Sequence, residues 1–550
     1  MENQETKHPA LRRAAIVLHV LVTVLSVSAC AAGIYTHILY PAEKLDELWF
    51  YLIGGVGEGG AGTVGSAAAV LALPVLAVSA LLLFLQYGFR LHPVGPHWRS
   101  RKTGEVRQLR LLPVRPRWLF TLVSCLLLVG IGLWQVGTFS YLASNATKSE
   151  WIELNYVSPK LPGRIKDPQK KRNLVFIELE SMETSFFSRE HGGLYDTEVI
   201  PELYELLSAP EAVYFTSDEG TRGTRNVFGS TWTTAALVSY TAGIPFKVPV
   251  GKDNSYHSEQ FLYGAWSLGD VLNSNGYRNI LVSGAMTSFG GVQEYFTAHG
   301  DYAIVDVHHP QFRGSDGQLL NFSVPDSQRN EWGFSDAATL QIAREVLTAQ
   351  TEKSDEPWHL FISTIDTHFT GYTYKAGNGY EGSVTSFDTQ AENVYATTSR
   401  EVGAFIDWLR SQPFYENTTV VIVGDHPNMS KYVCSGVSAD ERGRYNVILN
   451  SAVTTRNTKN RQFTAFDSYP TVLAAMGFEM KIDYLALGVN LFSDTMTYAE
   501  RYGLSWFNEE MSRKSEFYID HILGRGDYRD LGGDTETTAA PPAADDAPNP

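Results

Sequence analysis

The chain has 550 residues, too many for one small domain, and 44% of them are hydrophobic, enough for a large buried core. A formal net charge of −16 argues against nucleic acid as the main partner. Two of the three cysteines, Cys30 and Cys125, lie in apolar stretches and Cys434 stands alone, so the chain offers no disulfide framework. Any exported domain must therefore rely on its own core for stability.

Three long apolar stretches near the N-terminus predict transmembrane helices, at about residues 14–34, 63–87 and 118–142. Each has the roughly 20 residues that are needed to cross a bilayer. The first stretch is not a plain signal peptide, because it lacks a convincing cleavage site and two further apolar stretches follow it. Buried core helices are the alternative interpretation. We therefore expect residues 1–142 to form a membrane anchor.

The charges beside these stretches predict their orientation. Lys7, Arg12 and Arg13 precede the first stretch, and arginines and lysines are frequent between the second and the third. The segment between the first and the second carries mostly acidic charges. Because basic loops stay in the cytoplasm, the N-terminus should lie inside, and everything after Leu142 should lie outside the cytoplasmic membrane. This multi-pass arrangement with an extracytoplasmic domain excludes a cytosolic ATP-driven enzyme.

The rest of the chain divides into a polar linker at 143–172, a domain at 173–530 and a tail at 531–550. Within the domain, strand-like apolar runs alternate with helical patterns. The runs lie at 173–180, 279–283, 302–307, 359–366, 419–425 and 445–449. This alternation predicts an α/β fold with a mostly parallel central sheet that helices cover on both faces. The tail is rich in Ala, Pro, Asp and Thr and should be disordered.

The first of these runs ends in acidic residues. Bulky apolar side chains at 175–177 suit a buried strand, and Glu178 and Glu180 stand at its carboxyl end. In open α/β sheets ligands bind just beyond the carboxyl ends of the strands, where a carboxylate is a natural ligand for a hard cation. The alternative is a strand that simply meets solvent at this point.

A group of small and hydroxyl-bearing residues leads into a helical pattern within 229–245. Thr233 should lie at or near the helix N-terminus, where free N–H groups and the helix dipole favour an anion such as phosphate. Its hydroxyl could act as a nucleophile if a bound metal lowered its pKa. It could equally be a helix N-cap. Local alternatives for either role are Ser230, Thr231 and Thr234.

Two further strand-like runs also end in polar residues. The run at 359–366 leads into the sequence D-T-H, which ends at His368, and the run at 419–425 leads into Asp425 and His426. His368 could donate a hydrogen bond to a phosphate oxygen, act as a general acid, or be an ordinary histidine at the sheet edge. Asp425 and His426, side by side past a strand, can both reach one divalent cation.

These motifs occur in one order, with L-E-S at 179–181, W-T before G-I-P within 229–245, D-T-H at 366–368 and G-D-H at 424–426. In that order they resemble the lipoteichoic acid synthase and phosphoglycerol transferase group of the alkaline phosphatase superfamily, and most of all its glucan phosphoglycerol transferases. The resemblance covers about 173–488 and implies an alkaline-phosphatase-like (sulfatase-like) catalytic domain. No C-x-P-x-R motif is present, so a formylglycine sulfatase is not expected.

Carried over to this sequence, the resemblance implies a metal site and a nucleophile. One divalent cation, expected to be manganese with magnesium or zinc as alternatives, would be bound by Glu180, Thr233, Asp425 and His426. Thr233 would be the nucleophile, and His368 would contact the substrate phosphate. Glu178 matches no ligand position.

The implied reaction moves phosphoglycerol from phosphatidylglycerol to a glycan or polyglycerolphosphate acceptor through a phospho-threonine intermediate. Among enzymes, the alternatives are a phosphoethanolamine transferase and a phosphodiesterase or sulfuric-ester-type hydrolase of the same fold. From another class, the chain could be a catalytically idle membrane protein that binds glycans. A binding module has no need of a metal-activated hydroxyl, so the intact residue set favours an enzyme.

Overall fold

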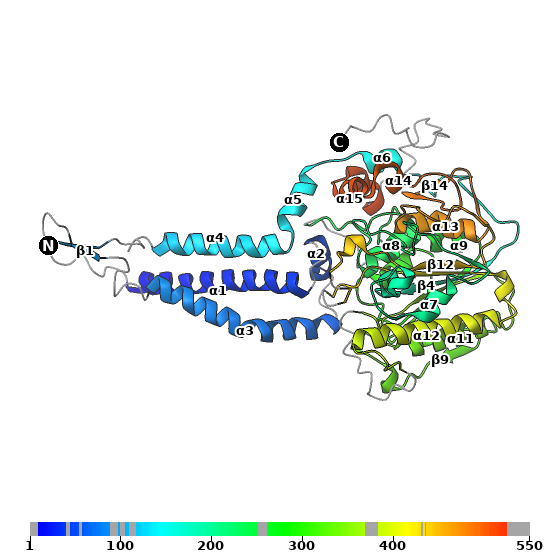
Figure 1. The fold of residues 1–550 in the computed structure, drawn as a ribbon, viewed down its shortest axis with the longest axis horizontal. Helices are drawn as coiled ribbons and strands as arrows, with labels where there is room; N and C mark the ends of the chain where they lie inside the picture. Colours follow the sequence, from blue (N-terminus) through cyan, green and yellow to red (C-terminus); the bar gives the residue numbers. More distant parts are fainter. Residues whose placement is uncertain are drawn as a thin grey trace. The chain divides into compact units, whose positions relative to one another are not determined.

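The computed structural model describes residues 9–39, 45–53, 58–87, 97–99, 105–108, 117–250, 261–368, 383–430, 433–434 and 436–524. The chain forms two compact units, and Figure 1 labels many of their helices and strands. The first comprises Met1–Leu48 and Glu58–Ala143, and the second comprises Trp49–Gly57 and Ser144–Pro550. The predicted tail at 531–550 lies outside the described residues, so its disorder stays a prediction.

The first unit is built from long apolar helices. α1 (Pro9–Leu39) and α3 (Glu58–Tyr87) each contain a segment that is long and apolar enough to cross a membrane. These segments are Arg13–Ile38 and Ala67–Gln86. Two apolar helices therefore lie where the sequence predicts the first two membrane spans.

The third apolar stretch is divided between two helices. α4 (Arg117–Gln135) and α5 (Thr138–Ala146) meet at a bend of 70°. Gly137 lies at the bend with a φ of +70°, a left-handed conformation that glycine adopts without strain. The described residues thus hold two candidate spans, or three if the bent pair counts as one. The prediction of one helix over 118–142 is therefore corrected to two helices that meet at this bend. Apolar composition alone does not reveal such a turn.

The second unit contains a seven-stranded sheet in the order β5-β12-β11-β4-β10-β6-β7. Its strands are β4 (Asn173–Leu179), β5 (Ala212–Val213), β6 (Arg278–Ser283), β7 (Ala303–Val305), β10 (Trp358–Ser363), β11 (Thr418–Gly424) and β12 (Asn446–Leu449). The strands from β11 to β7 run parallel, whereas β12 is antiparallel to β11 and β5 is antiparallel to β12. The mostly parallel α/β sheet predicted from the sequence is confirmed, with an antiparallel edge that the sequence did not reveal.

Helices cover both faces of this sheet (Figure 1). Side chains of β4 alternate between the faces, so that Leu174 and Phe176 enter one core while Val175 and Ile177 enter the other. The helices that contribute side chains to the first core include α8 (Thr233–Ala242), α9 (Leu268–Ser274), α10 (Val292–Ala298) and α13 (Ser468–Ala475). Those of the second core are α7 (Pro201–Leu206), α11 (Asp336–Thr351) and α12 (Gln390–Arg410).

Several of these helices begin at capping residues. The Ser335 side chain accepts a hydrogen bond from the Ala338 N–H at the start of α11. Thr389 and Glu392 form a capping box at the start of α12, in which each side chain accepts from the other's backbone N–H. These capping residues determine where α11 and α12 begin.

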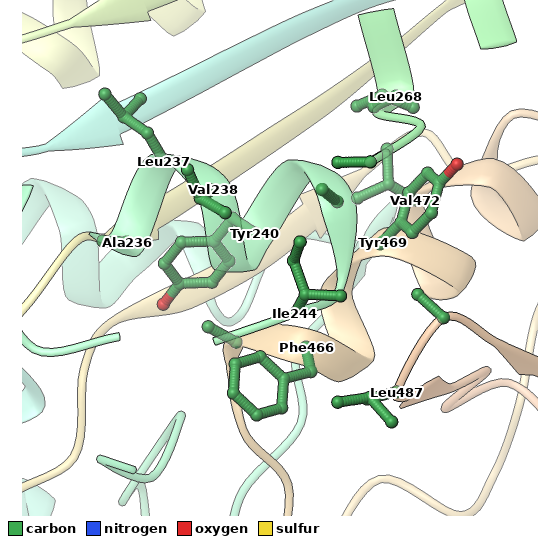
Figure 2. Close-up of a cluster of buried hydrophobic side chains, with 14 of the residues drawn as sticks. Ala236, Leu237, Val238, Tyr240, Ile244, Leu268, Phe466, Tyr469, Val472 and Leu487 are labelled. Atoms are coloured by element: carbon green, nitrogen blue, oxygen red, sulfur yellow. The ribbon is translucent and has the colours of Figure 1, made fainter. Parts of the chain in front are cut away.

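The core around α8 holds that helix in place. Figure 2 shows Leu237 and Tyr240 of α8 in one cluster with Tyr469 and Val472 of α13, and none of the four is more than 1% exposed. Burial of an apolar side chain such as Leu237 contributes about 1.5–3 kcal/mol to stability. This packing fixes α8, and with it the residue at its N-terminus, relative to the sheet.

Candidate active site

The carboxyl ends of β4 and β11 form the edge at which the predicted site residues meet. Gly424 pairs with Leu179, so the two strands end level with each other. A Cβ atom at Gly424 would lie 1.8 Å from the Met182 carbonyl oxygen, so only glycine permits this approach. As a result, Glu180 and Asp425 are the first residues past two adjacent strand ends.

Asp425 joins the loops that follow the two strands. Its Oδ1 accepts hydrogen bonds from the backbone N–H groups of Ser181 and His426, each at 2.6 Å. Ser181 has a φ of +52°, an uncommon left-handed conformation for serine. Asp425 Oδ2 is buried and has no hydrogen-bond partner within the described residues. An unpartnered buried carboxylate oxygen is costly, and a bound cation would satisfy it.

His426 directs one ring nitrogen at both acids. Its Nε2 lies 3.4 Å from Glu180 Oε1 and 3.2 Å from Asp425 Oδ2. Its Nδ1 lies 3.0 Å from the Pro427 carbonyl oxygen. If Nδ1 donates to that carbonyl, Nε2 presents a lone pair to the carboxylates. The ligand atoms of Glu180, Asp425 and His426 all lie within 4.8 Å of one another, an arrangement that could hold a metal ion.

Thr233 lies beside this cluster at the start of α8. It is the first helical residue, whereas the N-cap is Trp232, which makes no side-chain capping hydrogen bond. Thr233 Oγ1 lies 3.4 Å from Glu180 Oε2 and 3.3 Å from His426 Nε2. Its side chain is therefore turned to the acid and the imidazole rather than used as the cap of its own helix.

The neighbouring hydroxyl groups have other partners. Ser230 is 0% exposed, and its Oγ donates to the Val227 carbonyl at 2.8 Å. Thr234 Oγ1 donates to the Gly290 carbonyl at 2.8 Å. Of these three hydroxyl groups, only that of Thr233 is therefore directed at Glu180 and His426.

His368 follows β10 and lies near the same edge. Thr367, directly before it, donates to the Glu180 carbonyl at 2.5 Å. The half-buried His368 ring lies 4.7 Å from the ring of Trp332. Burial, and to a smaller extent the charge of His426, lowers the pKa of His368 to about 3. A neutral imidazole keeps one N–H, which can donate a hydrogen bond to a phosphate oxygen.

The acids at this edge resist ionisation when no cation compensates them. Burial, followed by the charge of Asp425, raises the pKa of both Glu178 and Glu180 well above the usual value. Burial likewise raises the pKa of Asp425. Glu178 Oε2 accepts a hydrogen bond from Ser363 Oγ at 3.1 Å, and Glu178 lies outside the ligand cluster. A divalent cation would reverse this balance, so the residue set fits a metal ion.

A family profile matches the part of the chain that carries these residues. The profile of the Sulfatase family matches residues 172–478, which is more than half of the chain. The chain belongs to the sulfatase family. The second unit, Trp49–Gly57 and Ser144–Pro550, contains the matched residues and is called the sulfatase domain. The resemblance that the sequence motifs predict is confirmed.

Two curated relatives of the sulfatase domain have the name Phosphoglycerol transferase I. The one from Xanthomonas euvesicatoria pv. vesicatoria (strain 85-10) is 28% identical over 356 residues, which cover 63% of this chain and 46% of the relative. The one from Escherichia coli (strain 55989 / EAEC) is 26% identical over 324 residues, which cover 58% of this chain and 39% of the relative. The chain thus spans less than half the length of these relatives. A solved structure of the lipoteichoic acid synthase LtaP from Listeria monocytogenes aligns at 17% identity and a TM-score of 0.43, covering 62% of this chain and 80% of that one.

One supporting network of the sulfatase domain was not anticipated from the sequence. The Asp366 carboxylate accepts hydrogen bonds from Asn330 Nδ2 at 2.8 Å and from the Asp336 N–H at 2.9 Å. Asp336 in turn accepts from the Ile365 N–H and from Thr398 Oγ1, each at 2.7 Å. Asp366 therefore anchors the loop that carries His368. The only local signal for Asp336 is its place directly after a helix N-cap.

Proposed function

We propose that the chain is a membrane-anchored, metal-dependent transferase that moves phosphoglycerol from phosphatidylglycerol to a cell-envelope glycan or polyglycerolphosphate. The observation that carries the proposal is the position of Thr233 Oγ1, 3.4 Å from Glu180 and 3.3 Å from His426. The name of the curated relatives supports the choice of transferred group.

The proposed metal site consists of one divalent cation. Its ligands would be Glu180, Thr233, Asp425 and His426, whose oxygen and nitrogen atoms suit manganese, with magnesium or zinc as alternatives. Asp425 Oδ2 is buried and accepts no hydrogen bond within the described residues, which supports this assignment. When bound, such a cation lowers the pKa of a coordinated hydroxyl group and offsets the charge of a transferring phosphoryl group.

Thr233 would perform the reaction in two displacements. Its Oγ attacks the phosphorus of the lipid, the Oγ–P bond forms, and the P–O bond to diacylglycerol breaks. The hydroxyl proton of Thr233 passes to water, and the departing oxygen takes up a proton to give diacylglycerol. An acceptor hydroxyl then attacks the phosphorus and displaces Thr233, which recovers its proton.

Other groups at the sheet edge would bind the phosphate. The α8 helix has ten residues, and its first-turn N–H groups point out of its N-terminus beside Thr233. Anions are favoured there by these donors and by the helix dipole. The N–H of neutral His368 would supply a further hydrogen bond to a phosphate oxygen.

The membrane arrangement belongs to the same proposal. With the N-terminus in the cytoplasm, spans in α1 and α3, and the bent pair of α4 and α5 as the third span, the linker at 143–172 and the catalytic domain at 173–530 lie outside the cytoplasmic membrane. The anchor then keeps the sulfatase domain at the outer leaflet, where the donor lipid and the glycan acceptor can both reach it.

The test uses the purified full-length chain, Mn²⁺ and head-group-labelled phosphatidylglycerol. We expect release of diacylglycerol and a phosphoglycerol adduct on the peptide that contains Thr233, detected by mass spectrometry. Labelled phosphatidylethanolamine, offered in parallel, distinguishes a phosphoethanolamine transferase. Free glycerol phosphate without an adduct would indicate a hydrolase. No release of diacylglycerol in the presence of metal would favour the alternative of a glycan-binding protein.

A further inference from the structure

Arg444 carries a charged group deep inside the sulfatase domain. It is 0% exposed, and it makes no ion pair of 4.0 Å or less with a carboxylate of the described residues. Its hydrogen bonds go mainly to backbone carbonyls, and Nη2 also donates to the side-chain Oγ of Ser230 at 3.3 Å. Nη1 donates to the carbonyls of Ser230 at 2.9 Å and Asp425 at 2.5 Å, and Nη2 donates to the carbonyl of Arg225 at 3.0 Å. A buried charge without a direct ionic partner is costly, so its presence requires an explanation.

These hydrogen bonds connect the two halves of the candidate site. Ser230 lies in the segment that leads into α8 and Thr233, whereas Asp425 lies in the loop after β11. A single nitrogen, Nη1, donates to both carbonyls. Neither segment can move away without losing a charge-assisted hydrogen bond in the protein interior.

Tyr240 forms a second connection between the same two elements. The Arg444 guanidinium lies over the Tyr240 ring, 5.2 Å from its centroid. The Tyr240 hydroxyl, which belongs to α8, donates to the carbonyl of Gly424 at 2.8 Å. The guanidinium and the phenol therefore join α8 to the strand end that carries the metal-ligand candidates.

The main chain of Arg444 is itself held firmly. Its N–H donates to the Thr224 carbonyl and its carbonyl accepts from the Thr224 N–H, each at 3.0 Å. The adjacent Tyr445 carbonyl accepts from the Gly424 N–H at 2.8 Å. The guanidinium thus starts from a fixed point between the two segments that it connects.

We propose that Arg444 is a positioning residue that sets the distance between Thr233 and the metal ligands. The inference rests on the proposed function, in which Thr233 is the nucleophile. Lysine would keep the charge but lacks the planar fork that donates to several carbonyls at fixed angles. A displacement of about 1 Å between reacting groups can lower a rate roughly 100-fold.

The test compares Arg444→Lys with the wild type in the full-length chain. We expect kcat for diacylglycerol release to fall by about 10- to 100-fold. KM should change much less, because the lipid-binding groups remain. Mn²⁺ affinity, measured by calorimetry, should weaken by no more than about 10- to 100-fold, because all four ligand side chains remain in the chain. A residue that only stabilises the fold would not separate kcat from KM in this way.

Arg461→Lys is the matched control. Arg461 is also buried, at 3% exposure, and it likewise donates to backbone carbonyls, those of Leu491 at 3.2 Å and Thr495 at 2.9 Å. These partners belong to a different part of the sulfatase domain, so the control should keep the wild-type kcat. A wild-type kcat in folded Arg444→Lys, or an equal loss in Arg461→Lys, would overturn the inference.

Two additions keep the test decisive. If Arg444→Lys does not fold, the Tyr240→Phe variant replaces it, because this change removes only the hydroxyl group that bonds to Gly424. This variant should lower kcat without raising KM, and an unchanged kcat would reject the positioning role.

Bis(4-nitrophenyl) phosphate serves as a second substrate. If the wild type cleaves this diester but not phosphatidylglycerol, the proposed lipid substrate fails while the variants still test Arg444. A wild type that cleaves neither removes both proposals.

Discussion

Thr233 Oγ1 lies 3.3 Å from His426 Nε2, although 193 positions separate the two residues in the chain. Thr233 begins α8, which packs on one face of the sheet, and His426 follows the end of β11. The hydroxyl therefore meets the imidazole only because helix and strand are fixed against each other by a shared core. In the proposed function this hydroxyl is the nucleophile.

The first prediction concerns the nucleophile. Thr233→Ala should lower phosphoglycerol transfer by at least about 1,000-fold, because no other oxygen replaces the attacking group. Thr234→Ala, which removes only the hydroxyl that donates to Gly290, should retain the covalent adduct. Transfer assays and mass spectrometry of both variants measure the effect. Normal transfer by Thr233→Ala would exclude this residue as the nucleophile.

The second prediction separates two buried acids of the same segment. Glu180→Gln should weaken Mn²⁺ binding by more than about 100-fold, since loss of a ligand should exceed the cost of losing an outer contact. Glu178→Gln is the control, because Glu178 is equally buried but bonds to Ser363. Metal content and calorimetry of the purified variants give the comparison. Equal losses in both would contradict the ligand assignment.

The third prediction concerns acid stability. Burial lowers the pKa of His359 in β10 to about 3, and its Nε2 has no hydrogen-bond partner within the described residues. Below about pH 6.5 the unfolded chain binds a proton that the folded chain does not, so stability falls as the pH is lowered from about 6.5 towards 3. The contribution is at most about 1.4 kcal/mol per pH unit.

His359→Gln should therefore make the pH dependence less steep. Urea unfolding, followed by tryptophan fluorescence between pH 5 and pH 7, measures the slope in both proteins, with the range set above the titration of ordinary carboxylates. Identical slopes for the variant and the wild type would show that His359 is not responsible.

The fourth prediction concerns a buried ion pair behind the site. Arg442 Nη1 lies 2.6 Å from Glu183 Oε1, with side-chain exposures of 7% and 0%. Glu183 also accepts a hydrogen bond from the Asn428 N–H at 2.7 Å. Glu183→Gln should destabilise the sulfatase domain by about 3–5 kcal/mol, because the Arg442 charge is left buried without its partner.

A double-mutant cycle provides the control for this pair. Arg442→Met combined with Glu183→Gln should cost clearly less than the sum of the two single changes, since the double variant leaves no unpaired charge. Additive losses would mean that the two side chains do not stabilise each other.

The sequence was most informative where a feature depends on neighbouring residues. Apolar runs such as 173–180 and 419–425 predict buried strands because most of their side chains are bulky and apolar and must avoid water. Polar residues directly past those runs predict site residues, because the ends of parallel strands meet at one edge. Glu180, Asp425 and His426 each lie at or directly past the end of such a run, and the family resemblance then predicts that they bind one cation together.

Features that depend on distant parts of the chain were not predictable in this way. The hydrogen bond from Arg444 to Ser230 joins residues 214 positions apart, and nothing near either residue in the sequence indicates it. The turn at Gly137 interrupts an apolar stretch without any change in composition. The antiparallel edge formed by β12 and β5 depends on pairing direction, which apolar patterning does not encode.

The central claim is that Glu180, Thr233, Asp425 and His426 bind one cation. Anomalous X-ray diffraction from crystals of the full-length chain grown with Mn²⁺ tests this claim most directly. We expect one manganese peak bound by Glu180, Asp425 and His426, with Thr233 Oγ1 as a further ligand at about 2.0–2.3 Å, the range found for oxygen ligands of such cations. A peak at another place, or an ion held by the acids and the histidine with Thr233 turned away, would contradict it.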